Sequence, residues 1–463
     1  MNSLLFRLTR HPVGLLGAAL ALASLILFLV LFGIEAVGFQ GGPYLGILTF
    51  IIIPAIFVLG LILMPIGLRL DRRRQERHQG DAFPVIDLNR PTVRRAALAF
   101  VGATVVNLGI LAIATYKGVE VMDSTEFCGE TCHSVMSPEF TTYQRSPHSR
   151  VNCVDCHIGP GAGWFVKSKL SGSWQLVSVA LDLYPTPIPT PVHNLRPARD
   201  TCEQCHWPEK FVGDRLVVKT HYEEDEANTP LKSVVVLRIG GVAGRQAHGI
   251  HWHVDPANEI RYLADESRST IHTVEMRDAS GGVKRFRAPD APAEADGEWR
   301  TMDCIDCHNR PSHIYKLPGT EMDLAFDAGQ LPSDLPYLKR EGMRLLQGSY
   351  ASHEEAREQI PAGLAAFYVS DDPAIATSRA DDIGRAGRKL AEIWCTNIHP
   401  AMNITWGTYP SHIGHEDFPG CFRCHDDQHA AEDGSTISQD CSTCHTLLAI
   451  QENNPPILAD LNP

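Results

Sequence analysis

The chain has 463 residues, a formal net charge of -13 and a pI near 5.9. Such an acidic balance argues against nucleic acid as a partner, because phosphate binding needs a basic surface. The length allows two or three domains, and 13 cysteines need an explanation of their own.

Three apolar runs near the N-terminus predict membrane spans. They cover residues 12–38, 44–70 and 96–116, and each is long enough to cross about 30 Å of hydrocarbon. We therefore expect residues 1–117 to form a membrane anchor. A cleaved signal peptide is the alternative for the first run, but its apolar stretch exceeds the roughly 7–15 residues of a signal-peptide core.

Arginines predict the orientation of this anchor. Arg7 and Arg10 precede the first run, and eight more arginines lie between Arg69 and Arg95. Basic residues favour the cytoplasmic side of a membrane. We therefore expect a three-span protein of the cytoplasmic (inner) membrane, with everything after residue 117 in the periplasm.

A repeated motif uses twelve of the 13 cysteines. Five copies read C-x-x-C-H and the first reads C-x-x-x-C-H, the attachment signal of c-type haem, in which two thiols bind the haem and the adjacent histidine binds its iron. Zinc is the alternative, but zinc sites need no histidine directly after the second cysteine. The attachment cysteines are Cys128, Cys132, Cys153, Cys156, Cys202, Cys205, Cys304, Cys307, Cys421, Cys424, Cys441 and Cys444, and the proximal histidines are His133, His157, His206, His308, His425 and His445.

From residue 96 onward the chain resembles the NapC/NirT family of membrane-anchored multihaem cytochromes c. The resemblance rests on a span followed by Cys128–His133, Ser146-Pro-His148, Cys153–His157, Cys202–His206 and His221, and it covers roughly residues 96–225. It implies a protein that oxidises membrane quinol and passes electrons to periplasmic partners. Three spans, at least six haems and the extra residue in the first motif depart from the typical members, which have one span and four haems.

The resemblance also implies two further roles. Met136 would be the weak axial ligand of haem 1, with an apolar core contact as the alternative. Lys169 would lie close to haem 2 and the quinol pocket, with a solvated or headgroup-facing lysine as the alternative. Because quinol must be oxidised within reach of the membrane, the carboxylates of Asp123, Glu126 and Glu130 are candidates to accept its protons.

Electron-transfer haems need a second axial ligand, which is usually histidine. His148 and His221 are candidates by resemblance. The remaining candidates stand clear of the attachment motifs and are His251, His253, His313, His399, His412, His415 and His429. His251 and His253 are two residues apart, which places both on one face if the segment is a strand; a structural role for both is the alternative.

Composition divides the residues after the anchor into three regions. Residues 118–230 carry haems 1–3, and short runs of β-branched residues within 231–300 predict a small β insert. Residues 301–463 carry haems 4–6 and a polar helical spacer from about 336 to 392. Two alternatives apply to the thirteenth cysteine, Cys395. It could attach a seventh haem through a single thioether bond, or it could be a buried plain cysteine.

The expected fold is therefore a membrane-anchored multihaem cytochrome c with a mainly α and irregular, haem-packed periplasmic domain. We expect six haems c, or seven with Cys395, and a quinol dehydrogenase that serves a periplasmic acceptor protein. The alternatives are a reductase of a small nitrogen or sulfur oxyanion and a passive wiring subunit of a larger membrane complex. A homo-oligomer also stays open.

Overall fold

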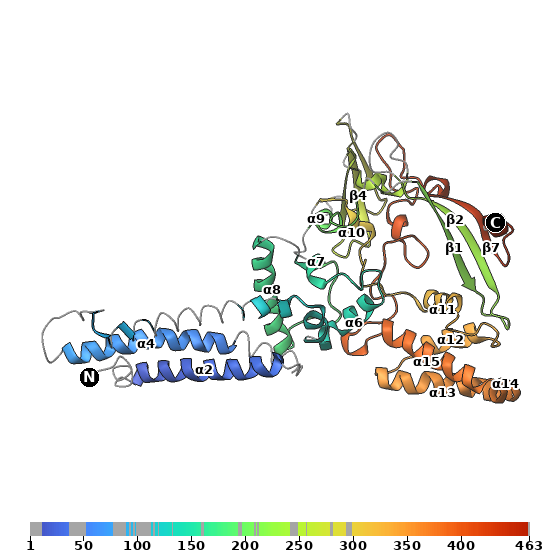
Figure 1. Cartoon of the computed structure of the whole chain (residues 1–463). Coiled ribbons are helices and arrows are strands. Elements are labelled where there is room, and N and C mark those ends of the chain that lie inside the picture. Colours follow the sequence, from blue (N-terminus) through green and yellow to red (C-terminus); the bar gives the residue numbers. More distant parts are fainter. Residues whose placement is uncertain are drawn as a thin grey trace. The chain divides into compact units, whose positions relative to one another are not determined.

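The computed structural model describes residues 12–36, 52–76, 89–91, 94–95, 98, 113, 116–118, 120–131, 133–158, 162–192, 197–207, 210, 213–240, 249–255, 257–277, 281–292 and 299–461. The chain divides into two compact units, Met1–His133 and Ser134–Pro463 (Figure 1). The first unit thus extends beyond the predicted end of the anchor at residue 117 and includes the first cysteine motif.

Two long apolar helices dominate the first unit. They are α2 (Pro12–Ala36) and α4 (Ile53–Glu76), and the segments Pro12–Gly33 and Ile53–Leu70 are long and apolar enough to cross a membrane. Most of their large apolar side chains are exposed, as expected of helices whose solvent is lipid. The third predicted span, residues 96–116, lies almost entirely outside the described residues.

Glycines let α2 and α4 approach each other closely. A Cβ atom added to Gly60 of α4 would lie 2.7 Å from the backbone oxygen of Gly17 and the backbone nitrogen of Ala21, both in α2. Small residues at such a contact permit the backbone-to-backbone packing that holds helices together in lipid. The two helices therefore form an antiparallel hairpin with a glycine-lined seam.

In the second unit most cysteine motifs begin on short helical turns. These are α7 (Cys153–His157), α9 (Ala198–Cys202), α10 (Cys304–Cys307), η6 (Gly420–Arg423) and η7 (Cys441–Thr443). Two longer helices, α6 (His133–Gln144) and α8 (Ala162–Ala180), flank α7. A helical turn suits the motif because it brings two cysteines three residues apart to one side of the backbone.

Two antiparallel sheets replace the single predicted β insert. One has the order β1-β2-β7, from β1 (Asp214–Tyr222), β2 (Pro230–Arg238) and β7 (His445–Glu452). The other has the order β5-β4-β3-β6, from β3 (Glu259–Ala264), β4 (Ile271–Arg277), β5 (Val283–Arg287) and β6 (Arg300–Thr301). The strands extend beyond the predicted segment 231–300, because β1 begins at Asp214 and β2 pairs with β7 from the C-terminal end.

Five helices build the largest protein core, below the sheets in Figure 1. They are α11 (Pro318–Asp327), α12 (Leu338–Leu346), α13 (His353–Asp371), α14 (Pro373–Ser378) and α15 (Ala380–Asn397). Leu346, Ile360, Leu364 and Leu390 are fully buried there, and each such side chain stabilises the fold by about 1.5–3 kcal/mol. The core of this part of the unit is therefore built from apolar side chains. The short elements η4 (Ile250–Val254), η5 (Pro400–Met402) and α16 (Ile457–Leu461) complete the described structure.

Candidate haem sites

The first motif adopts a different helical turn from the others. Residues Phe127–Thr131 form a π-helical turn, in which each hydrogen bond spans one residue more than in an α-helix. This wider turn contains the first cysteine of the motif that has the extra residue. None of the cysteines within the described residues forms a disulfide, so their thiols are chemically suited to haem attachment.

Five motif histidines each face a histidine from elsewhere in the second unit. The pairs are His157–His313, His206–His148, His308–His251, His425–His253 and His445–His415, with ring centroids 6.3, 6.0, 6.5, 5.7 and 6.1 Å apart. The sequence predicted all five second members as candidate axial ligands, without their pairing.

This spacing fits a metal ion between the two rings. Imidazole nitrogens bind metals at about 2 Å, and each lies about 1 Å from its ring centre, so two axial imidazoles have centroids about 6 Å apart. Zinc would instead need three or four converging protein ligands. Within the described part of the chain, no group of three or more His, Cys, Asp or Glu side chains is arranged to hold a metal ion.

Backbone carbonyls orient the second members of these pairs. In four of them Nδ1 lies within hydrogen-bond distance of a backbone carbonyl oxygen. The contacts are His148 to Pro311 at 3.2 Å, His251 to Ile239 at 2.8 Å, His253 to Ile250 at 2.8 Å and His313 to Glu139 at 3.0 Å. An Nδ1–H that donates to a carbonyl fixes the tautomer and leaves Nε2 as the metal-binding nitrogen. Four of the five rings are therefore oriented as iron ligands commonly are.

His251 and His253 do not lie on a strand, which corrects that prediction. They lie on the short 3-10 helix η4, directly after Gly249, which has a φ of +133°. A Cβ at Gly249 would meet the backbone oxygen of Arg238, so the close approach requires glycine. In a 3-10 helix, side chains two apart point in different directions, and the two rings consequently face different partners, His308 and His425.

Burial favours the neutral form of five of the paired rings. It lowers the pKa of His157, His253, His308, His313 and His445 below the ordinary histidine value. Neighbouring imidazoles lower the pKa of His157, His308 and His445 further, as His313 does for His157. A neutral imidazole is the form that binds a metal.

Residues that the sequence did not single out support two of the motifs. Glu139 of α6 accepts two hydrogen bonds from the buried guanidinium of Arg310, at 2.9 and 3.0 Å, and one of its oxygens lies 3.2 Å from Nδ1 of His313. The buried carboxylate of Asp306, inside the fourth motif, accepts from Tyr262 Oη at 2.6 Å and from Arg300 Nε at 2.7 Å. The acidic residue within C-I-D-C was the available sequence signal for the second network.

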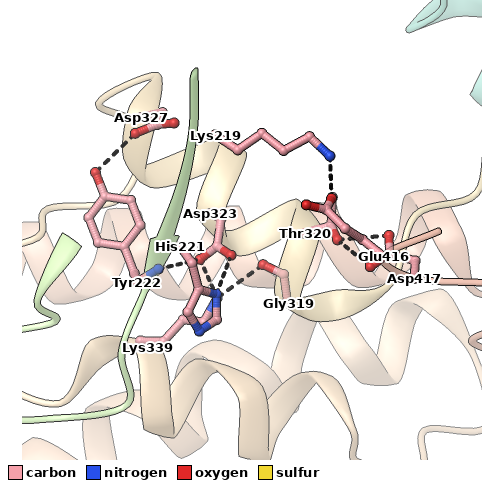
Figure 2. Close-up of polar contacts among 10 residues, drawn as sticks. All are labelled: Lys219, His221, Tyr222, Gly319, Thr320, Asp323, Asp327, Lys339, Glu416 and Asp417. Atoms are coloured by element: carbon pink, nitrogen blue, oxygen red, sulfur yellow. Dashed lines mark hydrogen bonds and ion pairs between the residues drawn. The ribbon is translucent and has the colours of Figure 1, made fainter. Parts of the chain in front are cut away.

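His221 is held by a polar network instead of facing a described motif histidine (Figure 2). Its Nδ1 lies 3.0 Å from Oδ2 of Asp323. The other carboxylate oxygen of Asp323 accepts hydrogen bonds from the backbone N–H of Tyr222 and from the buried Lys339. The side chain is half-exposed on the edge strand β1. The network ties β1 to α11 and α12, so a structural role accounts for the position of His221.

Three further candidates make other contacts. His429 uses both ring nitrogens, Nδ1 toward Asp426 and Nε2 toward the Ile271 carbonyl, each at 3.0 Å. His399 is buried, and its Nε2 donates to the Thr396 carbonyl at 3.3 Å. These two sets of bonds are typical of core histidines. His412 is buried with Nδ1 at 3.3 Å from the carbonyl of Asp306, the kind of bond that four of the paired rings make, so it stays a candidate ligand.

Cys395 lies in the main apolar core at the end of α15. Its sulfur is 3.7 Å from the carbonyl oxygen of His353, and the rings of His353 and His399 are 5.0 Å apart, closer than two axial ligands stand. The Nε2 atoms of both rings contact backbone carbonyls. Of the two alternatives for Cys395, this packing fits the buried plain cysteine.

The motifs follow one another in space as they do along the chain. Burial is the largest cause of the raised pKa of Cys156, and Cys205 of the third motif adds a smaller contribution. A hydrogen bond joins the thiols of Cys202 and Cys304, which belong to the third and fourth motifs. Cys421 similarly contributes to the raised pKa values of Cys307 and Cys444, in which burial is the largest cause. The second to sixth motifs are thus consecutive neighbours.

The residues expected near quinol fall in both units. Asp123 lies in a turn, Glu126 in a short helical stretch and Glu130 in the π-helical turn of the first motif. Lys169 lies in α8, and its side chain is outside the described set, as is that of His133. Met136 is half-buried in α6. The quinol site and the ligands of the first haem therefore stay predictions.

Comparison with known proteins agrees with the motif analysis. The N-terminal region of the NapC/NirT cytochrome c family matches residues 90–187. The chain is 42% identical over 455 residues to the cytochrome c-type protein ImcH of Geobacter sulfurreducens, a match that covers 96% of this chain and 89% of that protein. No solved structure matches significantly. The chain therefore belongs to the same family of c-type cytochromes as ImcH, with a NapC/NirT N-terminal region and covalently bound haem c.

Proposed function

We propose that this protein takes electrons from membrane quinol and passes them through a chain of six haems to a periplasmic acceptor protein. The observation that carries the proposal is the set of five histidine pairs at metal-binding distance. Two apolar helices that suggest an inner-membrane anchor, and the NapC/NirT match, support the membrane side of the proposal. A third span over residues 96–116 would put the haem domain in the periplasm.

Paired histidines favour electron transfer over reduction of a substrate. When bound, haem c supplies an iron that accepts and releases one electron at a time. The two imidazoles of each pair would both bind the iron of one haem, so haems 2–6 would be held by two protein ligands each and would offer no site for nitrite or another oxyanion. This argues against the reductase alternative at those haems.

The spatial order of the motifs favours a single route. Cys156 lies near Cys205, Cys202 near Cys304, and Cys307 near Cys421. Neighbouring attachment sites would keep consecutive haems close, and electrons would move from haem 2 toward haem 6 in chain order. Haem 6 would then be the site at which the acceptor protein takes the electron.

Quinol would be oxidised beside the first motif, where the chain leaves the membrane. Each quinol releases two electrons to the haems and two protons to water as it becomes quinone. Asp123, Glu126 and Glu130 would accept the protons, and Lys169 would orient a ring oxygen. Met136 would complete the ligands of haem 1, as the family resemblance implies.

The proposal is tested on the purified full chain in lipid nanodiscs. Mass spectrometry should show six haem additions, and the reduced protein should bind carbon monoxide at no more than one haem, because the five paired sites are closed. A soluble quinol analogue should reduce the haems within seconds. Carbon monoxide binding at several haems would support the reductase, and failure of every quinol to reduce the protein would support a wiring subunit.

A further inference from the structure

Helix α8 carries an apolar stripe that its own unit leaves uncovered. Leu170, Trp174 and Val177 are 69%, 63% and 44% exposed, and Leu181, just beyond the helix, is 64% exposed. Residues at these spacings share one helical face. The helical backbone continues to the last of them, because the N–H of Leu181 donates to the carbonyl of Val177 at 3.1 Å.

The opposite face attaches the helix to the second unit. Val179 lies about half a turn from this stripe and packs against a cluster that includes Val135, Tyr315 and Met402. Figure 1 shows α8 at the margin of the second unit, apart from its other helices. The stripe therefore faces away from the core that holds the helix, and it is larger than the scattered apolar residues of an ordinary surface.

We infer that α8 lies in the headgroup layer of the membrane, with Leu170, Trp174, Val177 and Leu181 inserted among the lipids. The helix contains Lys167 and Lys169 and no acidic residue, the composition that suits an anionic lipid surface. Tryptophan is also enriched at membrane interfaces, where its ring is partly apolar and its N–H stays wet. A lipid surface accounts for the stripe, the tryptophan and the lysines together.

This contact goes beyond anchoring by α2 and α4. An interfacial helix next to the second motif would hold the start of the haem chain at the depth where a lipid-soluble donor is available. The contact itself depends on the apolar face and the lysines, and not on which donor supplies the electrons.

Single cysteines introduced into α8 test the inference in the full chain. The protein is placed, one copy per disc, in nanodiscs of phosphatidylethanolamine and phosphatidylglycerol, and labelling by a charged maleimide is followed by mass spectrometry. We expect Leu170→Cys and Trp174→Cys to react about tenfold more slowly than the matched controls Ser171→Cys and Gln175→Cys on other faces of the helix. Visible absorbance confirms that each variant keeps its haems, and the Leu170/Ser171 pair suffices if a change at Trp174 prevents folding.

Photochemical crosslinking identifies what covers the stripe. A benzoyl-phenylalanine at position 174 should gain the mass of one lipid on irradiation. A crosslink to a second copy or to another segment of this chain would overturn the inference. Equal labelling rates at all four positions would also overturn it, because that is the result expected if the stripe binds a soluble partner protein. None of these outcomes bears on electron transfer, which is measured separately by haem reduction.

Discussion

At the scale of single residues, the bonds already made by the ring nitrogens separate iron ligands from core histidines. His253 donates from Nδ1 to the Ile250 carbonyl and turns its ring toward His425. His429 is also buried, but its two nitrogens contact Asp426 and the Ile271 carbonyl. Both were equal candidates in the sequence, and only the neighbours of each ring distinguish them.

Replacing a paired histidine should alter one haem and no other. We expect His253→Met to raise the midpoint potential of one haem, on the order of 0.1 V, because a thioether is a weaker donor than imidazole. Spectroelectrochemical titration measures the shift, and electron paramagnetic resonance should show the loss of one bis-histidine signal. The control His429→Asn should leave every haem signal unchanged, and an altered haem in that variant would contradict the assignment.

His399 should make the fold sensitive to acid. Burial lowers its pKa from 6.5 to about 4, so below pH 6.5 the unfolded chain binds a proton that the folded chain does not. Stability is therefore lost as the pH falls from about 6.5 toward 4, by up to about 3 kcal/mol from this group.

Chemical unfolding at pH 7.5 and pH 5 measures this loss. His399→Gln should lose less stability than the parent chain between those two pH values, whatever the substitution itself costs. Comparing the two proteins isolates His399 from His412, whose pKa burial also lowers to about 4. Identical losses in parent and variant would show that His399 is not the titrating group.

At the scale of secondary structure elements, α2 and α4 show how an apolar pair is held in lipid. In a membrane their outward side chains would contact lipid, so burial from water would add little to their association. The close backbone contact at Gly17 and Gly60 would then hold the pair together. The capping box at α10, formed by Asp303 and Asp306, plays a comparable part for a helix of one turn. In both cases a few small or polar residues stabilise an element whose own backbone hydrogen bonds would not suffice.

A large side chain at the seam should separate the two helices. We expect Gly60→Leu to destabilise the hairpin by about 1–3 kcal/mol, because its Cβ would already lie 2.7 Å from the α2 backbone. Thermal unfolding in nanodiscs and the yield of membrane-inserted protein are the measurements. Gly33→Leu in α2 is the control, since a Cβ there meets nothing within 4 Å; equal effects of the two changes would contradict packing at the seam.

At the scale of the whole molecule, the cofactor attachment sites form a sequence of neighbours beside a conventional apolar core. The helices α12, α13 and α15 bury Leu346, Leu364 and Leu390 in an apolar core, and such burial stabilises a fold. The sheet β1-β2-β7 ties the end of the sixth motif back to strands more than 200 residues earlier. Removing one haem should therefore interrupt a route without unfolding the unit.

Loss of the second or the sixth haem should have opposite consequences. Cys441→Ser with Cys444→Ser should leave reduction of the remaining haems by quinol intact but slow the transfer to a soluble acceptor. Cys153→Ser with Cys156→Ser should instead block reduction of the later haems, because electrons from the quinol site would have to pass the second haem to reach them. Stopped-flow absorbance on variants with a confirmed haem count distinguishes the two, and similar kinetics in both would contradict a linear route.

The sequence by itself determined the cofactor class, the two apolar helices α2 and α4 and the helical region after residue 336. These follow from local rules, namely motif spacing, span length and helical periodicity, that act within a few residues. The pairing of His148 with His206, the 3-10 turn at His251 and His253, and the union of β2 with β7 were decided by tertiary structure. Each joins segments that are far apart in the chain or depends on a backbone contact such as that of Gly249 with Arg238, and local sequence patterns carry no record of such contacts.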